Sequence, residues 1–516
     1  MKAIISVSNK DGLKTFAKKL LDLGFEIIST GGTKQFLEQN KIPVTAVSDI
    51  TQFPEILNGR VKTLHPAIHG GILSTNEQHH TNEINKHGIE QISLVIVNLY
   101  PFLETIKNEK TTFQEALENI DIGGPTMVRA AAKNFSNVIP IIDPEDYPWI
   151  IEKMQNSKSP KSALNCISLN ERKKLAVKAF EHISVYDATI TNYLKNGSNE
   201  YFGRHQTFGF IKTQNLRYGE NPHQTAAVYS NPSTSNGIVN SKQLHGIEMS
   251  FNNYLDADAA IELVSNFDKH AVVVVKHNNP CGLSINTEQS IAYEMAYQAD
   301  PVSAFGGIVG FNSEVTEKTA LAMKGIFFDV IVAPKFSDEA LEILKKRKKS
   351  RIVSFNPSKE SNFTSDMDVK LISGGALIQI KDNLVENLTE WKNVTKLKTN
   401  KNEFKDATFA WTIAKYVKSN AIVLVKENTL LGMGAGQPNR VSSLEIALKQ
   451  AGNKSVSSIL ASDAFIPFPD TIDLASKGKI SCIIQPGGSI RDKEVIEKAN
   501  ELGIKMIFTG IRHFRH

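Results

Sequence analysis

Cysteines, long apolar runs and long basic runs are scarce or missing in this 516-residue chain, and each absence excludes a class of protein. Its three cysteines, Cys166, Cys281 and Cys482, lie too far apart for a disulfide framework or a paired zinc-ligand motif. No apolar run approaches the roughly 18 residues that cross a bilayer, and MKAIISVSNKDG becomes polar too early for a secretory signal. A net charge of +5 without a basic run gives no sign of nucleic-acid binding. We therefore expect a cytoplasmic protein that requires no metal and has neither nucleic-acid nor membrane partners.

The remaining composition is that of a soluble globular protein, with 41% hydrophobic and 22% charged residues. Short apolar runs alternate with helical patterns in both halves, which predicts α/β domains and, in the first half, a parallel sheet. No fixed-period repeat is evident. Glycine, serine and polar residues interrupt the periodic pattern after a long amphipathic stretch. We therefore predict a first domain over 1–196, a linker over 197–206 and a second domain over 207–516.

Polar and glycine-rich motifs follow several predicted strands of the first domain. STGGT, residues 29–33, lies between a strand and a helix, where backbone N–H groups can bind a phosphate, although such a motif taken alone is more often simple turn chemistry. SVSNK precedes it, and RVKTLHP, NLYPF, DIGG and AAAKN follow. Cations and histidines in the constrained loop around RVKTLHP suggest a site, although a solvated loop with a capping histidine is the alternative.

These motifs, in this order, resemble the inosine monophosphate (IMP) cyclohydrolase domain of the PurH family of bifunctional purine-biosynthesis proteins. The resemblance implies a methylglyoxal-synthase-like fold that closes the purine ring of a formylated aminoimidazole carboxamide ribotide with loss of water. It also assigns catalytic roles to Lys62, Tyr100, Asp121 and Lys133. The substrate-binding positions that follow from the same motifs are Ser8, Lys10, Ser29, Gly31, Gly32, Thr33, Arg60, Thr63, Asn98, Gly123 and Gly124.

In the second half, VVVVKHNNPCG ends a predicted buried strand at Lys276 and His277. Consecutive strand residues point to opposite faces, so both side chains can reach one ligand only if the strand is already turning there. Asn278, Asn279 and Pro280 favour such a turn. Upstream, LRYGENPHQ places Arg217, Tyr218 and His223 in a turn-rich segment that either binds an anionic planar ligand or is a polar surface turn.

With DPVSAFGG, GMGAGQPNR, SDAFIPFPD and IRHFRH, these motifs resemble the folate-dependent transformylase domain of the same family. The resemblance implies two cytidine-deaminase-like subdomains, 10-formyltetrahydrofolate as co-substrate and a homodimer. It makes Lys276 and His277 the catalytic pair. Substrate positions are Arg217, Tyr218, His223 and Arg512, and folate positions are Asn312, Phe465, Asp470 and His516. Leu397 departs from the family pattern, so folate contacts in its loop stay open.

Two other interpretations remain. PCG at 280–282 matches half of the P-C-x-x-C motif of zinc deaminases, but Ser284 stands where the second cysteine is needed. The first domain could also be a regulatory nucleotide-binding module without chemistry. Together they describe a nucleotide-regulated deaminase-like hydrolase, which is the alternative to a bifunctional formyltransferase and cyclohydrolase.

Overall fold

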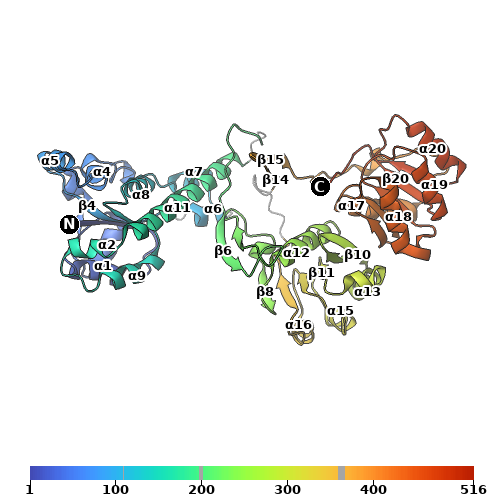
Figure 1. The fold of residues 1–516 in the computed structure, drawn as a ribbon, viewed down its shortest axis with the longest axis horizontal. Helices are drawn as coiled ribbons and strands as arrows, with labels where there is room; N and C mark the ends of the chain where they lie inside the picture. The colour runs from blue at the N-terminus through green and yellow to red at the C-terminus, as the bar shows by residue number, and fades with distance from the viewer. Residues whose placement is uncertain (101, 109, 197–200, 358–365) are drawn as a thin grey trace. The chain divides into compact units, whose positions relative to one another are not determined.

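The chain folds into two compact units in a computed structural model that describes residues 1–100, 102–108, 110–196, 201–357 and 366–516 (Figure 1). Unit 1 contains 1–210 and 231–233, and unit 2 contains 211–230 and 234–516. Of the predicted linker, 197–200 lie outside the described residues. Its remaining residues belong to unit 1, where Lys195 Nζ donates to the carbonyl of His205 at 3.3 Å.

Unit 1 is built on a five-stranded sheet of order β3-β2-β1-β4-β5, and every neighbouring pair is parallel. Its strands are β1 Lys2–Val7, β2 Glu26–Ser29, β3 Thr45–Ala46, β4 Ile92–Asn98 and β5 Ile139–Ile141. Its helices are α1 Leu13–Asp22, α2 Gly31–Gln39, α3 Val47–Thr51, α4 Pro66–Leu73, α5 Gln78–Lys86, α6 Phe102–Lys107, α7 Phe113–Glu118, α8 Gly123–Lys133, α9 Tyr147–Met154, α10 Pro160–Asn165 and α11 Leu169–Lys195. The predicted parallel sheet is confirmed.

Each face of this sheet has its own core because successive strand residues point to opposite sides. Ala3, Ile5 and Val7 of β1 pack with Phe16 of α1, whereas Ile4 belongs to the core formed with α4, α8 and α11. With both faces covered by helices, ligands can reach the sheet at the carboxyl ends of its strands.

Unit 2 has a twelve-stranded sheet of order β16-β21-β20-β19-β17-β18-β10-β9-β11-β12-β13-β8. The strands are β8 Lys242–His245, β9 His270–Lys276, β10 Asn279–Asn286, β11 Ile308–Phe311, β12 Val330–Ala333, β13 Arg351–Ser354, β16 Lys392–Asn393, β17 Ile422–Lys426, β18 Thr429–Gly434, β19 Ile459–Ser462, β20 Cys482–Gln485 and β21 Lys505–Phe508. Two separate hairpins are β6 Ile211–Leu216 with β7 Ala226–Ser230, and β14 Met367–Ile372 with β15 Gly375–Ile380. The helices are α12 Phe251–Val264, α13 Gln289–Ala299, α14 Pro301–Ala304, α15 Glu317–Ala322, α16 Asp338–Lys345, α17 Lys401–Ala414, α18 Arg440–Ala451, α19 Asp470–Lys477 and α20 Asp492–Glu501.

The two halves of this sheet repeat one α/β arrangement, which the sequence did not reveal as a fixed-period repeat. α12 followed by the β9–β10 hairpin corresponds to α17 followed by β17–β18. The offset is 150 residues at matching positions, as in Asp256 and Asp406 or Lys276 and Lys426. The halves join where β10 pairs with β18 through Ser284 and Thr429.

Strand directions determine which loops meet at each edge of the unit 2 sheet. β9 and β18 end at one edge, which we name the Lys276 edge. β11 is antiparallel to β9, so β11 and its parallel neighbours β12 and β13 begin at this edge. β17 is antiparallel to both β18 and β19, so β19 and its parallel neighbours β20 and β21 end at this edge, as β18 does. The opposite edge, where β11 ends, is the Asn312 edge. No helix within the described ranges is both long and apolar enough to span a membrane.

Candidate active sites

The first candidate site lies at the carboxyl ends of β1, β2 and β4 in unit 1. The Oδ1 atom of Asn98 accepts the backbone N–H groups of Ser8 and Asn9 at 2.6 and 3.0 Å, which ties the end of β4 to the end of β1. Thr33 Oγ1 bonds the backbone of Val7, and Ser29 Oγ donates to the carbonyl of Ile5 at 2.7 Å. The predicted residues Ser8, Ser29, Thr33 and Asn98 are therefore neighbours.

The N-terminus of α2 is shaped to receive an anion next to Lys62. Gly31 has φ +51°, and a Cβ there would lie 3.4 Å from Lys62 Nζ, so glycine leaves room for the ammonium group. No side-chain cap occupies the first N–H groups of this helix, since the Thr30 hydroxyl bonds Glu55 instead. Free N–H groups and a nearby lysine together fit a phosphate.

Asp121 is the most perturbed acid of this site. Burial raises the pKa of its carboxyl group above the ordinary value, opposed by the N–H groups of Gly124, Tyr100 and Gly123 and by Lys62. The Gly124 N–H donates to Asp121 Oδ1 at 2.9 Å. A Cβ on Gly123 would meet Thr63 Oγ1 at 2.6 Å, so this loop needs glycine to approach Thr63. The structure thus brings Lys62, Tyr100 and Asp121 together.

Three other predicted cations lie apart from Asp121 or already have partners. Lys133 ends α8, whereas Asp121 precedes its first turn, so the helix separates them by about 15 Å at 1.5 Å per residue. Arg60 forms an ion pair with Glu118. Lys10 Nζ lies 3.4 Å from the carbonyl of Ser8, near the end of β1.

The second candidate site is the turn that Lys276 and His277 form at the end of β9. His277 and Asn278 have φ of +52° and +61°, as in the two-residue turn of a tight hairpin. Asp256, from α12, accepts their N–H groups at 3.1 and 2.7 Å. Lys276 Nζ donates to the carbonyl of Phe305 at 2.8 Å, so the turn presents a fixed ammonium group beside an exposed imidazole.

Other polar groups reach the Lys276 edge from neighbouring strands. Asp329 precedes β12, bonds Asn253 Nδ2 at 3.2 Å and forms an ion pair with Arg351 at 3.2 Å. Burial lowers the pKa of Arg351. The charges of Asp329, Arg217 and Tyr218 also influence this pKa, so the predicted turn at 217–223 lies near Arg351. Sequence reasoning missed Asp256, Asp329 and Phe305. The repeated aspartate at 256 and 406 was a signal that could have revealed the first.

Loops from the second half of the sheet supply the remaining predicted residues at this edge. Phe465 and Asp470 follow β19, and Arg512 and His516 follow β21. The Phe465 side chain is 39% exposed, and Asp470 Oδ1 accepts the N–H of Thr471 at 2.7 Å. Four strand spacings of about 4.8 Å separate β9 from β19, so these two strands lie roughly 19 Å apart within one chain.

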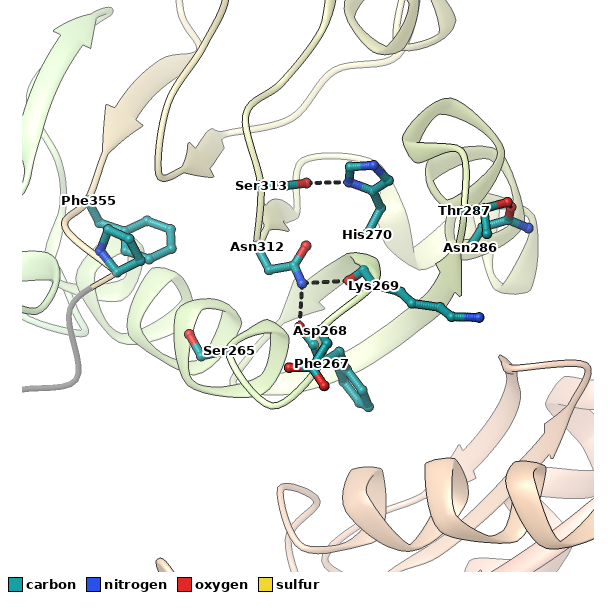
Figure 2. Close-up of a pocket in the computed structure, with 11 residues that line it drawn as sticks. Ser265, Phe267, Asp268, Lys269, His270, Asn286, Thr287, Asn312, Ser313 and Phe355 are labelled. Atoms are coloured by element: carbon teal, nitrogen blue, oxygen red, sulfur yellow. Dashed lines mark hydrogen bonds between the residues drawn. The ribbon is translucent and has the colours of Figure 1, made fainter.

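Asn312 lies at the opposite edge from Lys276, because it follows the last residue of β11. Its Nδ2 donates to the carbonyls of Phe267 and Lys269, each at 2.7 Å, and its Oδ1 accepts the N–H of Ala271 at 2.9 Å. Figure 2 shows this amide beside a hollow of about 430 Å³. Leu397 also lies at the Asn312 edge, because β16 runs antiparallel to β21. The structure therefore does not bring either residue to the Lys276 turn.

Cys281 has the character of a core residue. Burial raises the pKa of its thiol to about 12, and Sγ lies 3.4 Å from the carbonyl of Val274. Within the described residues, no cluster of three or more His, Cys, Asp or Glu side chains is arranged to hold a metal ion.

A parallel sheet with an uncapped helix N-terminus and a buried acid, followed by a duplicated α/β unit with a Lys-His turn, is typical of an enzyme with two candidate sites. The family described as "AICARFT/IMPCHase bienzyme" matches residues 131–450, and the family described as "MGS-like domain" matches 12–126. Relatives named bifunctional purine biosynthesis protein PurH are 49% identical in Dictyostelium discoideum, over all of both chains, and 51% identical in Thermoanaerobacter sp. (strain X514), over all of this chain and 99% of the relative.

The chain belongs to the AICARFT/IMPCHase bienzyme family, whose members combine a formyltransferase with an IMP cyclohydrolase. It is a bifunctional enzyme of purine biosynthesis, which confirms the resemblance, the fold class and the two activities predicted from the sequence.

Proposed function

We propose that the two units catalyse successive steps at separate sites. In unit 2, the amino group of the aminoimidazole carboxamide ribotide AICAR takes the formyl group of 10-formyltetrahydrofolate, giving the formylated ribotide FAICAR and tetrahydrofolate. In unit 1, FAICAR loses water and closes to IMP. The observation that carries this proposal is the Lys276–His277 turn, held by Asp256 and Phe305 in one unit while Lys62 and Asp121 meet in the other.

At the Lys276 edge, His277 acts as general base. The acceptor amine is conjugated with its ring, so it must lose a proton as it attacks, and an imidazole can accept that proton. Lys276 stabilises the negative charge that develops on the formyl oxygen. Its hydrogen bond to Phe305 uses one N–H and leaves two for the reacting groups.

Formyltetrahydrofolate supplies the activated formyl group when bound. The exposed ring of Phe465 and the carboxylate of Asp470 fit a planar heterocycle with amino substituents, and both follow β19 at the Lys276 edge. Arg217 and Arg512 are cations suited to the ribotide phosphate, and Tyr218 and His223 belong to the same turn-rich segment as Arg217. His516, close to Arg512 in sequence, is a folate position. Asn312 fits less well, because its amide already bonds the backbone of 267–271.

In unit 1, ring closure requires a carboxamide nitrogen to attack a formamide carbon. Lys62 and Tyr100 stabilise the oxygen on which negative charge develops, and Asp121, whose pKa is raised by burial, transfers protons. The N-terminus of α2 with Gly31 and Gly32 binds the ribotide phosphate, and Ser8, Lys10, Ser29, Thr33, Arg60, Thr63 and Asn98 line the approach.

We also propose that the protein is a cytoplasmic homodimer that acts on small molecules without a metal, a nucleic acid or a membrane. The roughly 19 Å between β9 and β19 is too far for both strand ends to touch one formyl group, so loops of a second copy would bring them together. The β14–β15 hairpin supports this, since Leu371, Ile372 and Leu377 are at least half exposed. Such an apolar hairpin is suited to burial against another subunit.

The test follows folate release and purine-ring formation separately in single variants. His277→Ala should reduce formyl transfer by roughly 10²–10⁴-fold and spare ring closure of supplied FAICAR. Lys62→Ala should do the reverse. A third variant, Lys133→Ala, tests whether Lys133 acts in ring closure even though α8 separates it from Asp121. If either His277→Ala or Lys62→Ala depressed both steps equally in folded protein, the two-site proposal would fail.

A further inference from the structure

The segment after β21 is an extended strap with an inner and an outer row of side chains. Within it, His513 is only 2% exposed and Arg515 is half-buried, whereas Arg512, Phe514 and His516 are exposed. This alternation matches the two-residue period of an extended chain. The strap therefore turns one row toward the body of unit 2 and presents the other at the Lys276 edge.

His513 anchors the inner row through both of its ring nitrogens. Nδ1 bonds Asp382 Oδ2, and Nε2 lies 2.6 Å from Glu386 Oε1. Ionised carboxylates only accept hydrogen bonds, so both nitrogens must donate, and only the imidazolium form has two N–H groups. The geometry therefore requires a positively charged His513.

The carboxylates around His513 are themselves held in place. Glu386 also accepts the indole N–H groups of Trp391 and Trp411 at 3.1 and 2.5 Å. Lys415, on the turn after α17, forms an ion pair with Asp382 at 3.3 Å. Two carboxylates thus face two cations in a site walled by indole rings.

The other charged groups near the strap are paired with different partners. Arg515 forms an ion pair with Glu262 of α12 at 3.1 Å and lies over the Tyr416 ring, while Asp258 of the same helix is influenced by Glu262, Lys381 and Arg515. Asp463 accepts the His513 N–H through its carbonyl, and its carboxylate bonds Ser419 and Arg440. The charge of His513 is thus balanced by Asp382 and Glu386, which raise its pKa to about 8 despite burial.

We propose that the His513 imidazolium is a positioning residue for formyl transfer, which pins the strap so that Arg512 is held at the Lys276 edge. The inference rests on the proposed role of Arg512 in binding the ribotide. Loss of the proton would leave one ring nitrogen without a hydrogen to share with a facing carboxylate, and the strap would lose an anchor one residue from Arg512. Ribotide affinity in formyl transfer should therefore fall as pH rises above about 8.

The test compares His513→Gln with His270→Gln. His270 is a matched control because its Nδ1 bonds only the neutral Ser313 hydroxyl, at 2.7 Å and at the Asn312 edge. The KM for AICAR in formyl transfer is measured from pH 6.5 to 9.5, with ring closure of supplied FAICAR in the same protein as the reference. His513→Gln should raise KM between about 10-fold and 10²-fold and should remove the alkaline rise in KM that we expect for the unaltered enzyme. His270→Gln should keep that rise.

Two further variants separate the possible failures. Asp382→Asn retains the histidine and should shift the alkaline rise in KM, and the NMR titration of His513, to lower pH, so the inference stays testable if His513→Gln does not fold. If the KM profile were unchanged in His513→Gln and in Asp382→Asn while Arg512→Ala bound the ribotide poorly, the role of His513 would be overturned. If Arg512→Ala bound the ribotide normally, the proposed site assignment would be wrong instead.

Discussion

Asp256 and its repeat counterpart Asp406 allow the geometry of the Lys276–His277 turn to be separated from the stability of the fold. Asp256 accepts the N–H groups of His277 and Asn278 at 3.1 and 2.7 Å. Asp406 accepts those of Glu427 and Asn428, both at 2.8 Å, in the equivalent turn at the Asn312 edge. Asp256→Asn and Asp406→Asn therefore remove the same kind of support from two turns, of which one carries His277.

The stability cost of the two substitutions should be similar. Hydrogen bonds to a charged group contribute about 1.5–3 kcal/mol each, but an asparagine keeps one oxygen acceptor and loses the other. Burial raises the pKa of Asp256, which means that the cost of burying its charge offsets part of the stabilisation from its two hydrogen bonds. We expect each variant to lower the free energy of unfolding of unit 2 by about 2 kcal/mol in urea titrations.

Their effects on chemistry should differ. Without two firm anchors the Lys276–His277 turn shifts, and a misplacement of about 1 Å typically costs about 10²-fold in rate. Asp256→Asn should slow formyl transfer by that factor, Asp406→Asn should leave it near normal, and neither should alter ring closure. Equal losses of formyl transfer in both variants would show that general weakening of unit 2, rather than turn geometry, limits the reaction.

Two further predictions concern folding. A fragment of residues 1–210, which keeps α11 and the segment bonded to it through Asn192, should fold alone and close the ring of supplied FAICAR; a folded but inactive fragment would contradict a self-contained site. For His513, a folded-state pKa of about 8 lies above the reference value of about 6.5, so its contribution of about 2 kcal/mol is complete below pH 6.5 and is lost as pH rises through 8. Urea unfolding at pH 6 and pH 9 should therefore show a stability difference between the unaltered protein and His513→Gln only at the lower pH.

Local sequence patterns predicted the elements and the turn because their causes are local. β1 is an apolar run because its successive residues are buried in the cores on opposite faces of the sheet. The asparagines after Lys276 favour the left-handed turn that places the Lys-His pair at a strand end. Glycines 31, 123 and 124, which the motifs predict as substrate-binding positions, leave room for Lys62, Thr63 and Asp121 respectively, and their binding role stays a prediction.

Strand direction and long-range pairing limited the prediction of the sites. Asn312 follows a strand as Lys276 does, but β11 is antiparallel to β9, so the two residues end at opposite edges. Lys133 is close to Asp121 in sequence, yet a whole helix separates them. The cluster of His513 with Asp382 and Glu386 joins positions more than 120 residues apart, for which no spacing rule exists.

The duplicated fold of unit 2 shows why the scaffold alone does not determine where formyl transfer occurs. Lys426 repeats the contact of Lys276, since its Nζ donates to the carbonyl of Val456 at 3.1 Å, and Asp406 holds its turn as Asp256 holds the first. The backbone N–H groups of Asn312 and Asp463 both donate to the equivalent alanines, Ala271 and Ala421, at 3.3 Å.

The two copies differ in the side chains that could move a proton. Glu427 stands where the first copy has His277, so the second copy has a carboxylate in place of the imidazole that we propose as general base. Because the halves run in opposite directions, only the first turn shares an edge with the loops after β19 and β21 that carry Phe465 and Arg512. A second transfer site would need both a histidine at 427 and cationic loops at the Asn312 edge, so Glu427→His alone should not create one.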